Sequence, residues 1–292
     1  MQQTLDAAVV LLSGGQDSAT CLAWALRRYQ RIHAVTFDYG QRHKIELDAA
    51  ATISTMAGVS QSVIPCNSFT ALGGNALTGT EAVSATVRAD SQLPNTFVPG
   101  RNLIFITLAA ACAYQRGITE IVTGICQTDY SGYPDCRMDT MVALQEALRR
   151  GMEAPFTIHT PLMYLTKAET VHMMRDLGRM DLLAHSHTCY NGSVPPCGTC
   201  PACELRSRGF REAGIADPLI ERLAMGPAPT GRPRCARQGP LSAPPAQPAT
   251  AGRCCLLLAS LRPSARCSGP DHQATSIWIP PAPLASITAA AT

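Results

Sequence analysis

The residues Ser13 to Ser18, SGGQDS, have the types and spacing of a turn that binds an anion. The apolar run before them, VVLL, is typical of a buried parallel strand, and the two glycines let the backbone turn tightly and present its N–H groups. Residues 19–28 have a helical pattern, so a bound phosphate would lie at a helix N-terminus. A Walker loop is excluded because it ends in Lys-Ser/Thr, whereas the only lysines are Lys44 and Lys167.

The same loop resembles the pyrophosphate loop (PP-loop) of ATP pyrophosphatases, which split ATP between its α and β phosphates and activate a partner as an adenylate. This resemblance implies AMP-forming chemistry rather than kinase or GTPase chemistry. The alternative is a plain strand-to-helix turn in which Asp17 only caps the helix. The two serines, the aspartate and the strand directly before the turn favour the functional interpretation.

A second candidate site consists of four cysteines in the stretch CYNGSVPPCGTCPAC, namely Cys189, Cys197, Cys200 and Cys203. Their spacing is typical of a single tetrahedral zinc, and the glycines and prolines between them suit sharp turns. Four thiolates leave no open coordination position, so we expect a structural metal. Disulfides are the alternative, but the chain starts without the features of a secretory signal, and a reducing cytosol favours metal.

Composition divides the 292 residues into two parts. Residues 1–225 mix apolar runs with charged helical faces, and they are predicted to form one catalytic domain that includes the cysteine site at 189–203. Residues 226–292 are dense in Pro, Ala, Ser and Arg, and Asp271 is their only acidic residue. That composition predicts a disordered tail, with a segment translated out of its ancestral frame as the alternative.

The charge and hydropathy of the chain exclude some classes of partner. The net charge of +3 is mild and much of it comes from the tail arginines, so nothing favours a nucleic-acid partner. No stretch approaches the roughly 18 consecutive apolar residues of a membrane span. The sequence therefore predicts a cytoplasmic protein with no membrane partner.

Strand and helix signals alternate after the first apolar run. Strands are predicted at 33–37, 62–65 and 120–124, and helices at 43–56, 102–116, 138–150 and 167–177, with the apolar 102–116 expected to be buried. Residues 67–99 show no clear period, and a loop of this length inside a domain is usually functional or mobile. The alternation predicts an α/β fold with a doubly wound parallel sheet whose ligands bind beyond the carboxyl ends of the strands.

Several blocks together resemble the 7-cyano-7-deazaguanine synthases over about residues 9–218. The blocks are SGGQDSATCL, TFDYGQRH, PNTFVPGRN, TGICQTDYSGYPDCR, TPLMYLTKAET and the cysteine cluster. The resemblance implies an adenine nucleotide alpha hydrolase-like, Rossmann-like fold and a homodimer. It also implies that ATP activates 7-carboxy-7-deazaguanine as an adenylate, that ammonia gives an amide, and that a second adenylation gives the nitrile. Mg²⁺ is expected beside ATP to neutralise the charge of the leaving pyrophosphate.

The resemblance also suggests roles for individual residues. The ATP-binding segment is Leu12, Ser13, Gly14, Gly15, Gln16, Asp17, Ser18, Ala19, Thr20, Cys21 and Leu22, with Asp17 as a metal-side carboxylate. Thr36 and Phe37 are placed to meet the nucleoside. Arg101 is expected to grip a carboxylate or phosphate through two hydrogen bonds.

Other roles stay open between alternatives. Asp129 and Asp135, in the loop after strand 120–124, are candidates to bind the deazaguanine or Mg²⁺. Lys167 reaches the phosphates or pairs with Glu169 or Asp176. His185 and His187 are interpreted as groups around the zinc shell or at the surface, because four cysteines already fill that shell.

The sequence leaves two kinds of rival function, another PP-loop enzyme and a non-enzymatic module. The PP-loop rivals are a tRNA thiolase, an amide-forming synthetase, or a synthetase of the NAD or GMP type. A thiolase would need a reactive cysteine, for which Cys126 and Cys136 are candidates. A glutamine-dependent amide synthetase would need a glutaminase domain, for which there is no room before Val9. A zinc-knuckle binding module would explain the cysteines but not the PP-loop.

Overall fold

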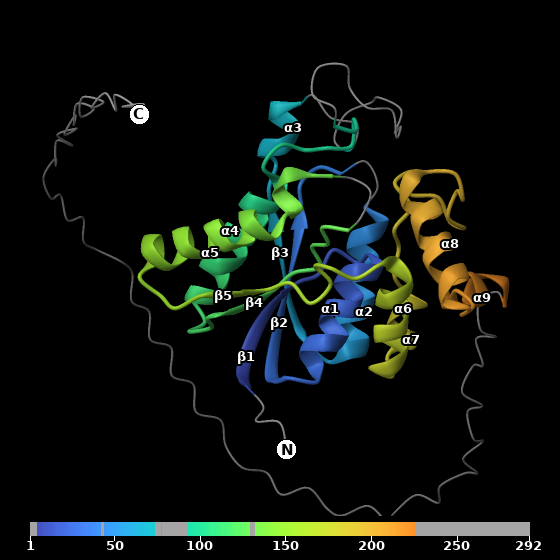
Figure 1. The fold of residues 1–292 in the computed structure, drawn as a ribbon, viewed down its shortest axis with the longest axis horizontal. Coiled ribbons are helices and arrows are strands. Elements are labelled where there is room, and N and C mark those ends of the chain that lie inside the picture. The colour runs from blue at the N-terminus through green and yellow to red at the C-terminus, as the bar shows by residue number, and fades with distance from the viewer. Residues whose placement is uncertain (1–4, 42–43, 74–76, 78–92, 129–131, 226–292) are drawn as a thin grey trace, which may run out of the picture. The chain divides into compact units, whose positions relative to one another are not determined.

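The computed structural model describes residues 5–41, 44–73, 77, 93–128 and 132–225, and its centre is a five-stranded parallel sheet (Figure 1). The strand order is β3-β2-β1-β4-β5, and every neighbouring pair is parallel. The strands are β1 Leu5–Leu11, β2 Tyr29–Asp38, β3 Ser60–Pro65, β4 Glu120–Val122 and β5 Thr157–His159. The predicted parallel sheet is thus confirmed.

Helices cover both faces of this sheet. They are α1 Gln16–Leu26, α2 Ile45–Ala57, α3 Ser68–Leu72, α4 Arg101–Tyr114, α5 Met138–Met152, α6 Lys167–Asp176, α7 Met180–Leu183, α8 Pro201–Ala213 and α9 Pro218–Ala224, with a short 3-10 helix at Pro134–Cys136. The core residues of α1, α2, α6 and α7 pack on one face, and those of α4 and α5 pack on the other. The doubly wound architecture predicted from the sequence is therefore present.

The alternation of side chains along β1 explains how one strand serves two cores. Ala8 and Val10 belong to the core on the α1 side, whereas Ala7 and Val9 belong to the core on the α4 side. Successive side chains of a strand point to opposite faces, so a strand covered on both sides must be apolar throughout. This is why the run before the glycines reads as a continuous apolar segment.

The order of the strands fixes where a ligand can bind. The chain moves from β1 through β2 to β3, then returns and adds β4 on the other side of β1. The carboxyl ends of β1 and β4 therefore border a topological switch point, where open α/β sheets bind their ligands. Gly124, just after β4, comes so close to α1 that an added Cβ would lie 3.1 Å from the Ser18 nitrogen.

Some predicted elements differ from the observed ones. The helix predicted at 102–116 is not fully buried, because Ile104 is 38% and Tyr114 56% exposed. The stretch 67–99 contains α3, and β5, α7, α8 and α9 were not predicted. The described residues all fall in the unit Met1–Arg232, and residues 226–292 lie outside them, so the predicted division at residue 225 stays a prediction.

Candidate active site

A cavity of about 880 Å³ opens beyond the carboxyl ends of β1, β2 and β4. The loop between β1 and α1 contributes Ser13, Gly15, Gln16, Asp17 and Ser18 to its lining. The remaining predicted ATP-binding residues after Ser18 do not line it, because Ala19, Thr20, Cys21 and Leu22 are buried in the core side of α1. Leu12 also lines the cavity, whereas Gly14 is not among its lining residues, so six of the eleven predicted residues reach the cavity.

The glycine loop is held in a compact form by its own serines. Gly14 has φ +91°, a conformation that favours glycine, and a Cβ there would lie 2.8 Å from the Ala50 nitrogen of α2. The Ser13 hydroxyl donates to Ser18 Oγ at 3.1 Å, and the Gly15 N–H donates to Ser13 Oγ at 3.3 Å. The loop thus leads directly into the N-terminus of α1, where the helix dipole favours an anion.

Asp17 and Lys167 form an ion pair across the mouth of this loop. Lys167 Nζ lies 2.5 Å from Asp17 Oδ2, and the side chains are 9% and 28% exposed, respectively. Within the described part of the chain, the buried Asp17 Oδ1 and Gln16 Nε2 have no hydrogen-bond partner. Lys167 therefore pairs with Asp17, while Glu169 forms a capping box with Thr166.

Arg101 begins α4 and lines the cavity on the side away from α1. Its guanidinium carbon lies 5.9 Å from the centre of the Tyr39 ring. Asp135 is 5% exposed and accepts a hydrogen bond from the Asn102 N–H at 3.1 Å, so it holds the first turn of α4 and is not among the cavity-lining residues. Asp129, the other carboxylate considered for substrate or metal, lies outside the described residues.

The two residues expected to meet the nucleoside have different surroundings. Phe37 lines the cavity and stacks on Phe105 with ring centroids 4.3 Å apart. Thr36 is 1% exposed, and its hydroxyl donates to the Leu12 carbonyl at 2.6 Å. Thr36 therefore ties β2 to the start of the glycine loop, whereas Phe37 offers an apolar surface to the cavity.

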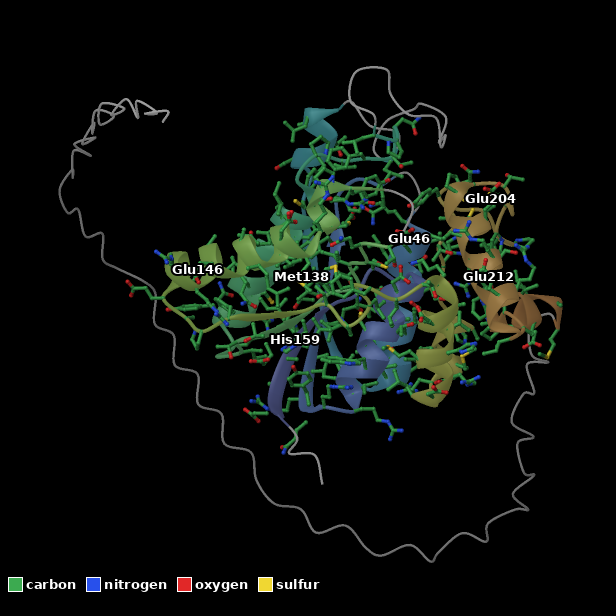
Figure 2. All side chains as sticks on the ribbon, viewed as in Figure 1. Glu46, Met138, Glu146, His159, Glu204 and Glu212 are labelled. Atoms are coloured by element: carbon green, nitrogen blue, oxygen red, sulfur yellow. The ribbon has the colours of Figure 1, made fainter. Side chains whose placement is uncertain are left out.

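Sequence reasoning missed Glu46, Tyr39 and Tyr190 as cavity residues. Glu46 stands in the first turn of α2, at the upper end of that helix in Figure 2. Burial raises the pKa of Glu46 to about 7, and the Arg101 guanidinium opposes that shift. Tyr190 follows the first cysteine of the cluster, and burial raises its pKa. The TFDYGQRH block contains Tyr39, but nothing in the pattern of α2 distinguishes Glu46 from a surface glutamate.

The four predicted cysteines converge on one point. Their four sulfur atoms all lie within 4.8 Å of one another, namely those of Cys189, Cys197, Cys200 and Cys203. Cys197 Sγ is 3.9 Å from Cys203 Sγ. Zn–S bonds of about 2.3 Å in a tetrahedron require sulfurs about 3.8 Å apart, so the donor set fits zinc. None of the nine cysteines within the described ranges forms a disulfide. Hydrogen bonds, first from the Thr199 backbone, lower the pKa of Cys197 to about 5.

The histidines near this cluster differ in position. His187 is 5% exposed and lines the cavity, and its backbone N–H donates to the Gly14 carbonyl at 2.9 Å. His185 is partly exposed, and burial lowers its pKa. Cys126 and Cys136, the candidate nucleophiles of a thiolase, both line the cavity.

The sheet order, the glycine loop after β1 and the cavity beyond it define a doubly wound α/β protein with a ligand cavity at its switch point. A sequence model of the family described as "Queuosine biosynthesis protein QueC" matches residues 7–214. The chain belongs to this QueC family.

Curated relatives agree with that assignment. A protein of Chromobacterium violaceum named 7-cyano-7-deazaguanine synthase is 60% identical over 224 residues, which are 76% of this chain and 96% of the relative. One of Laribacter hongkongensis with the same name is 61% identical over 218 residues, 74% of this chain and 95% of the relative. A solved 4-thiouridine synthetase–RNA complex with bound ATP aligns with a TM-score of 0.41 and 18% identity, covering 75% of this chain and 50% of that one.

Proposed function

We propose that this protein is an ATP-dependent ligase that converts 7-carboxy-7-deazaguanine and ammonia into 7-cyano-7-deazaguanine for queuosine biosynthesis. The acid attacks the α-phosphorus of ATP to give an acyl adenylate and pyrophosphate, and ammonia then displaces AMP to give the amide. The amide oxygen attacks a second ATP, and loss of AMP leaves the nitrile. Each nitrile therefore consumes two ATP and releases two AMP and two pyrophosphates. The family match and the relatives' name support this reaction.

The proposal depends most on the glycine loop facing the same cavity as Asp17, Lys167 and Arg101. The loop and the N-terminus of α1 suit the β and γ phosphates, since backbone N–H groups and the helix dipole both favour anions. Phe37 and the apolar floor beside it suit the adenosine. Other PP-loop reactions, including thiolation at Cys126 or Cys136, would use the same loop, and the family membership favours the ligase.

Asp17 has the features of a carboxylate beside a metal-bound phosphate. Lys167 holds one carboxylate oxygen, and the other is buried without a partner within the described residues. A hard cation such as Mg²⁺ prefers such an oxygen, so the residue fits the expected metal. The chemistry that Mg²⁺ supplies when bound is neutralisation of charge on the departing pyrophosphate.

Arg101 is suited to hold the carboxylate of the acid. It projects from the start of α4 into the cavity, where a planar guanidinium can donate two parallel hydrogen bonds to a carboxylate. Its position across the cavity from the α1 side leaves space for the phosphates between them. Asp129 and Asp135 stay candidates for the heterocycle or for Mg²⁺, although Asp135 is occupied with the first turn of α4.

The cysteine cluster is proposed to hold one structural zinc. The donor set is closed, with four thiolates and no position for substrate. The described cysteines form no disulfide, which agrees with a reducing compartment, and we expect the enzyme to act in the cytoplasm as a homodimer. Within the described residues no helix has the length and apolar character needed to cross a bilayer.

One assay tests the function directly. The full chain is incubated with ATP, MgCl₂, ammonium chloride and 7-carboxy-7-deazaguanine, and the products are identified by mass spectrometry. We expect the nitrile with two AMP per nitrile, and Asp17→Asn should abolish it. Release of ADP and orthophosphate, or AMP formation that is independent of the acid, would overturn the proposal.

A further inference from the structure

Glu46 stands in the cavity where the glycine loop meets the Arg101 side. Its backbone carbonyl packs so closely on Gly14 that a Cβ on that glycine would collide with it. The side chain is half-buried and lines the cavity, and Figure 2 shows it at the end of α2 nearest the loop. The first turn of α2 is therefore fixed against the phosphate loop, and Glu46 lies between the expected sites of ATP and of the acid.

The groups that face Glu46 come from three other elements. Arg101 is provided by α4, Tyr39 by the segment after β2, and Tyr190 by the cysteine loop, and each is in electrostatic contact with the Glu46 carboxylate. Lys44, two residues before Glu46, forms an ion pair with Asp38, in which Nζ lies 3.1 Å from Oδ2. Burial raises the pKa of Glu46 to about 7 and Arg101 limits that rise, so the group can take up and release a proton near neutral pH.

The reaction needs such a group repeatedly, because the nitrile nitrogen keeps none of the three hydrogens of ammonia. One N–H bond breaks when ammonia forms the C–N bond of the amide and AMP leaves with the electrons of the C–O bond. Two more break when the adenylated amide loses AMP and its C–N bond becomes triple. Each proton must pass to an acceptor near the carbon that is attacked, and from there to solvent.

Among the described residues that line the cavity, three carry carboxylates, and two of them are poorly suited to this task. Asp17 is engaged with Lys167, and Glu204 is exposed on the first turn of α8. We propose that Glu46 is the proton acceptor for the nitrogen in both halves of the reaction. This inference rests on the proposed function and adds a residue to it.

The test separates adenylation from the nitrogen steps. Exchange of labelled pyrophosphate into ATP, driven by the acid without ammonium, requires no N–H bond to break. Glu46→Gln should therefore keep this exchange within about threefold of the wild type. Nitrile formation should fall by roughly 10²-fold or more, which is the usual contribution of a general base. Idle hydrolysis of the adenylate should raise the AMP released per nitrile.

The second half of the reaction gives an independent readout. With 7-amido-7-deazaguanine and ATP no ammonium is needed, so the ionisation of ammonium does not affect the pH profile. The wild-type rate should rise with pH and level off above about 7, since only the carboxylate accepts a proton. Glu46→Gln should lose this rise. Glu46→Asp, which keeps a shorter carboxylate, should recover part of the rate.

Glu146→Gln is the matched control, because Glu146 lies on α5 with an exposed side chain and is not among the residues that line the cavity. It should behave as the wild type in both assays. Equal loss of exchange and nitrile in Glu46→Gln would overturn the inference, since Glu46 would then serve binding or adenylation. Unchanged nitrile formation would overturn it in favour of another base such as His187. Absence of acid-dependent exchange in the wild type would instead refute the proposed function.

Discussion

Gly209 is the position where a single methyl group should disturb the active site from outside it. The residue lies within α8, which packs on the first turn of α6. A Cβ on Gly209 would lie 2.7 Å from Lys167 Cβ and 3.3 Å from the Lys167 carbonyl carbon. Carbon atoms normally approach to about 3.5–4.0 Å, so Gly209→Ala forces a displacement of about 1 Å in one of the two helices.

The packing cost of Gly209→Ala can be separated from its effect on helix propensity by a second glycine substitution. Gly151 also lies within a helix, α5, and an added Cβ there meets nothing within 4 Å. Gly151→Ala should stabilise the protein by about 0.5–1 kcal/mol through helix propensity alone. Gly209→Ala gains the same propensity term but adds overpacking of about 1–3 kcal/mol. The difference between the two variants in free energy of unfolding is therefore the packing cost.

The same displacement should reach the chemistry, because Lys167 holds Asp17 at 2.5 Å. Misplacement of a positioning group by about 1 Å can lower turnover by roughly 10²-fold. Urea unfolding and acid-dependent pyrophosphate exchange would be measured for both variants. If Gly209→Ala matches Gly151→Ala in stability and in exchange, the close packing of α8 on Lys167 does not position the site.

Three further substitutions test other contacts. Arg101→Lys should lower kcat/KM for the acid by roughly 10- to 100-fold in steady-state kinetics, because a second charged hydrogen bond is lost. A wild-type kcat/KM would mean that Arg101 does not touch the acid. Lys167→Met should lower the free energy of unfolding in urea by roughly 1–3 kcal/mol, less than the loss of a fully buried pair, because Asp17 is 28% exposed. Adding Asp17→Asn should recover part of this loss, and additive effects of the two substitutions would contradict their coupling. Cys200→Ser should lower Tm and reduce the zinc found by metal analysis from one per chain to nearly none, while the control Cys66→Ser should keep the metal. Retained zinc in Cys200→Ser would contradict a four-cysteine site.

The sequence predicted the sheet because its central strands are covered on both faces. β1 and β2 appear as apolar runs followed by glycine or charged residues, and the helices between them have recognisable periods. β5 has three half-buried residues, Thr157–His159, at the sheet edge, so it carries no apolar run. α3 has only five residues, too few to display a helical period within the stretch 67–99.

The partners of the site residues were harder to predict than the residues themselves. Lys167 was suggested by its sequence block, but its partner Asp17 stands 150 residues away, beyond any local pattern. Glu169 was the nearer candidate, but a Glu three residues after Thr166 completes a capping box, so its carboxylate is engaged at the start of its own helix.

Glu46 was missed for a related reason. An acidic residue in the first turn of a helix is ordinarily explained by the helix dipole, and the sequence of α2 gives no reason to look further. Its significance comes from Gly14, whose positive φ and close contact with the Glu46 carbonyl bring the two segments together. Such a contact is a product of the tertiary fold, so no local pattern could have revealed it.

The cysteine loop connects the two sides of this site. The backbone N–H of His187, two residues before Cys189, bonds the Gly14 carbonyl, and Tyr190, the residue after it, lines the cavity. The N-terminal part of the cysteine loop therefore forms part of the cavity wall and is hydrogen-bonded to the glycine loop. Cys189 in this part is only 1% exposed, so its sulfur is shielded from solvent.

The other end of the cluster starts α8. Cys200 is the N-cap of that helix and Cys203 lies in its first turn, so their sulfurs fix the direction in which α8 leaves the cluster. That direction brings Gly209 against Lys167 two turns later. A metal with no open coordination position would thus control the geometry of the Lys167–Asp17 pair without touching substrate, because it sets the helix against which Lys167 packs.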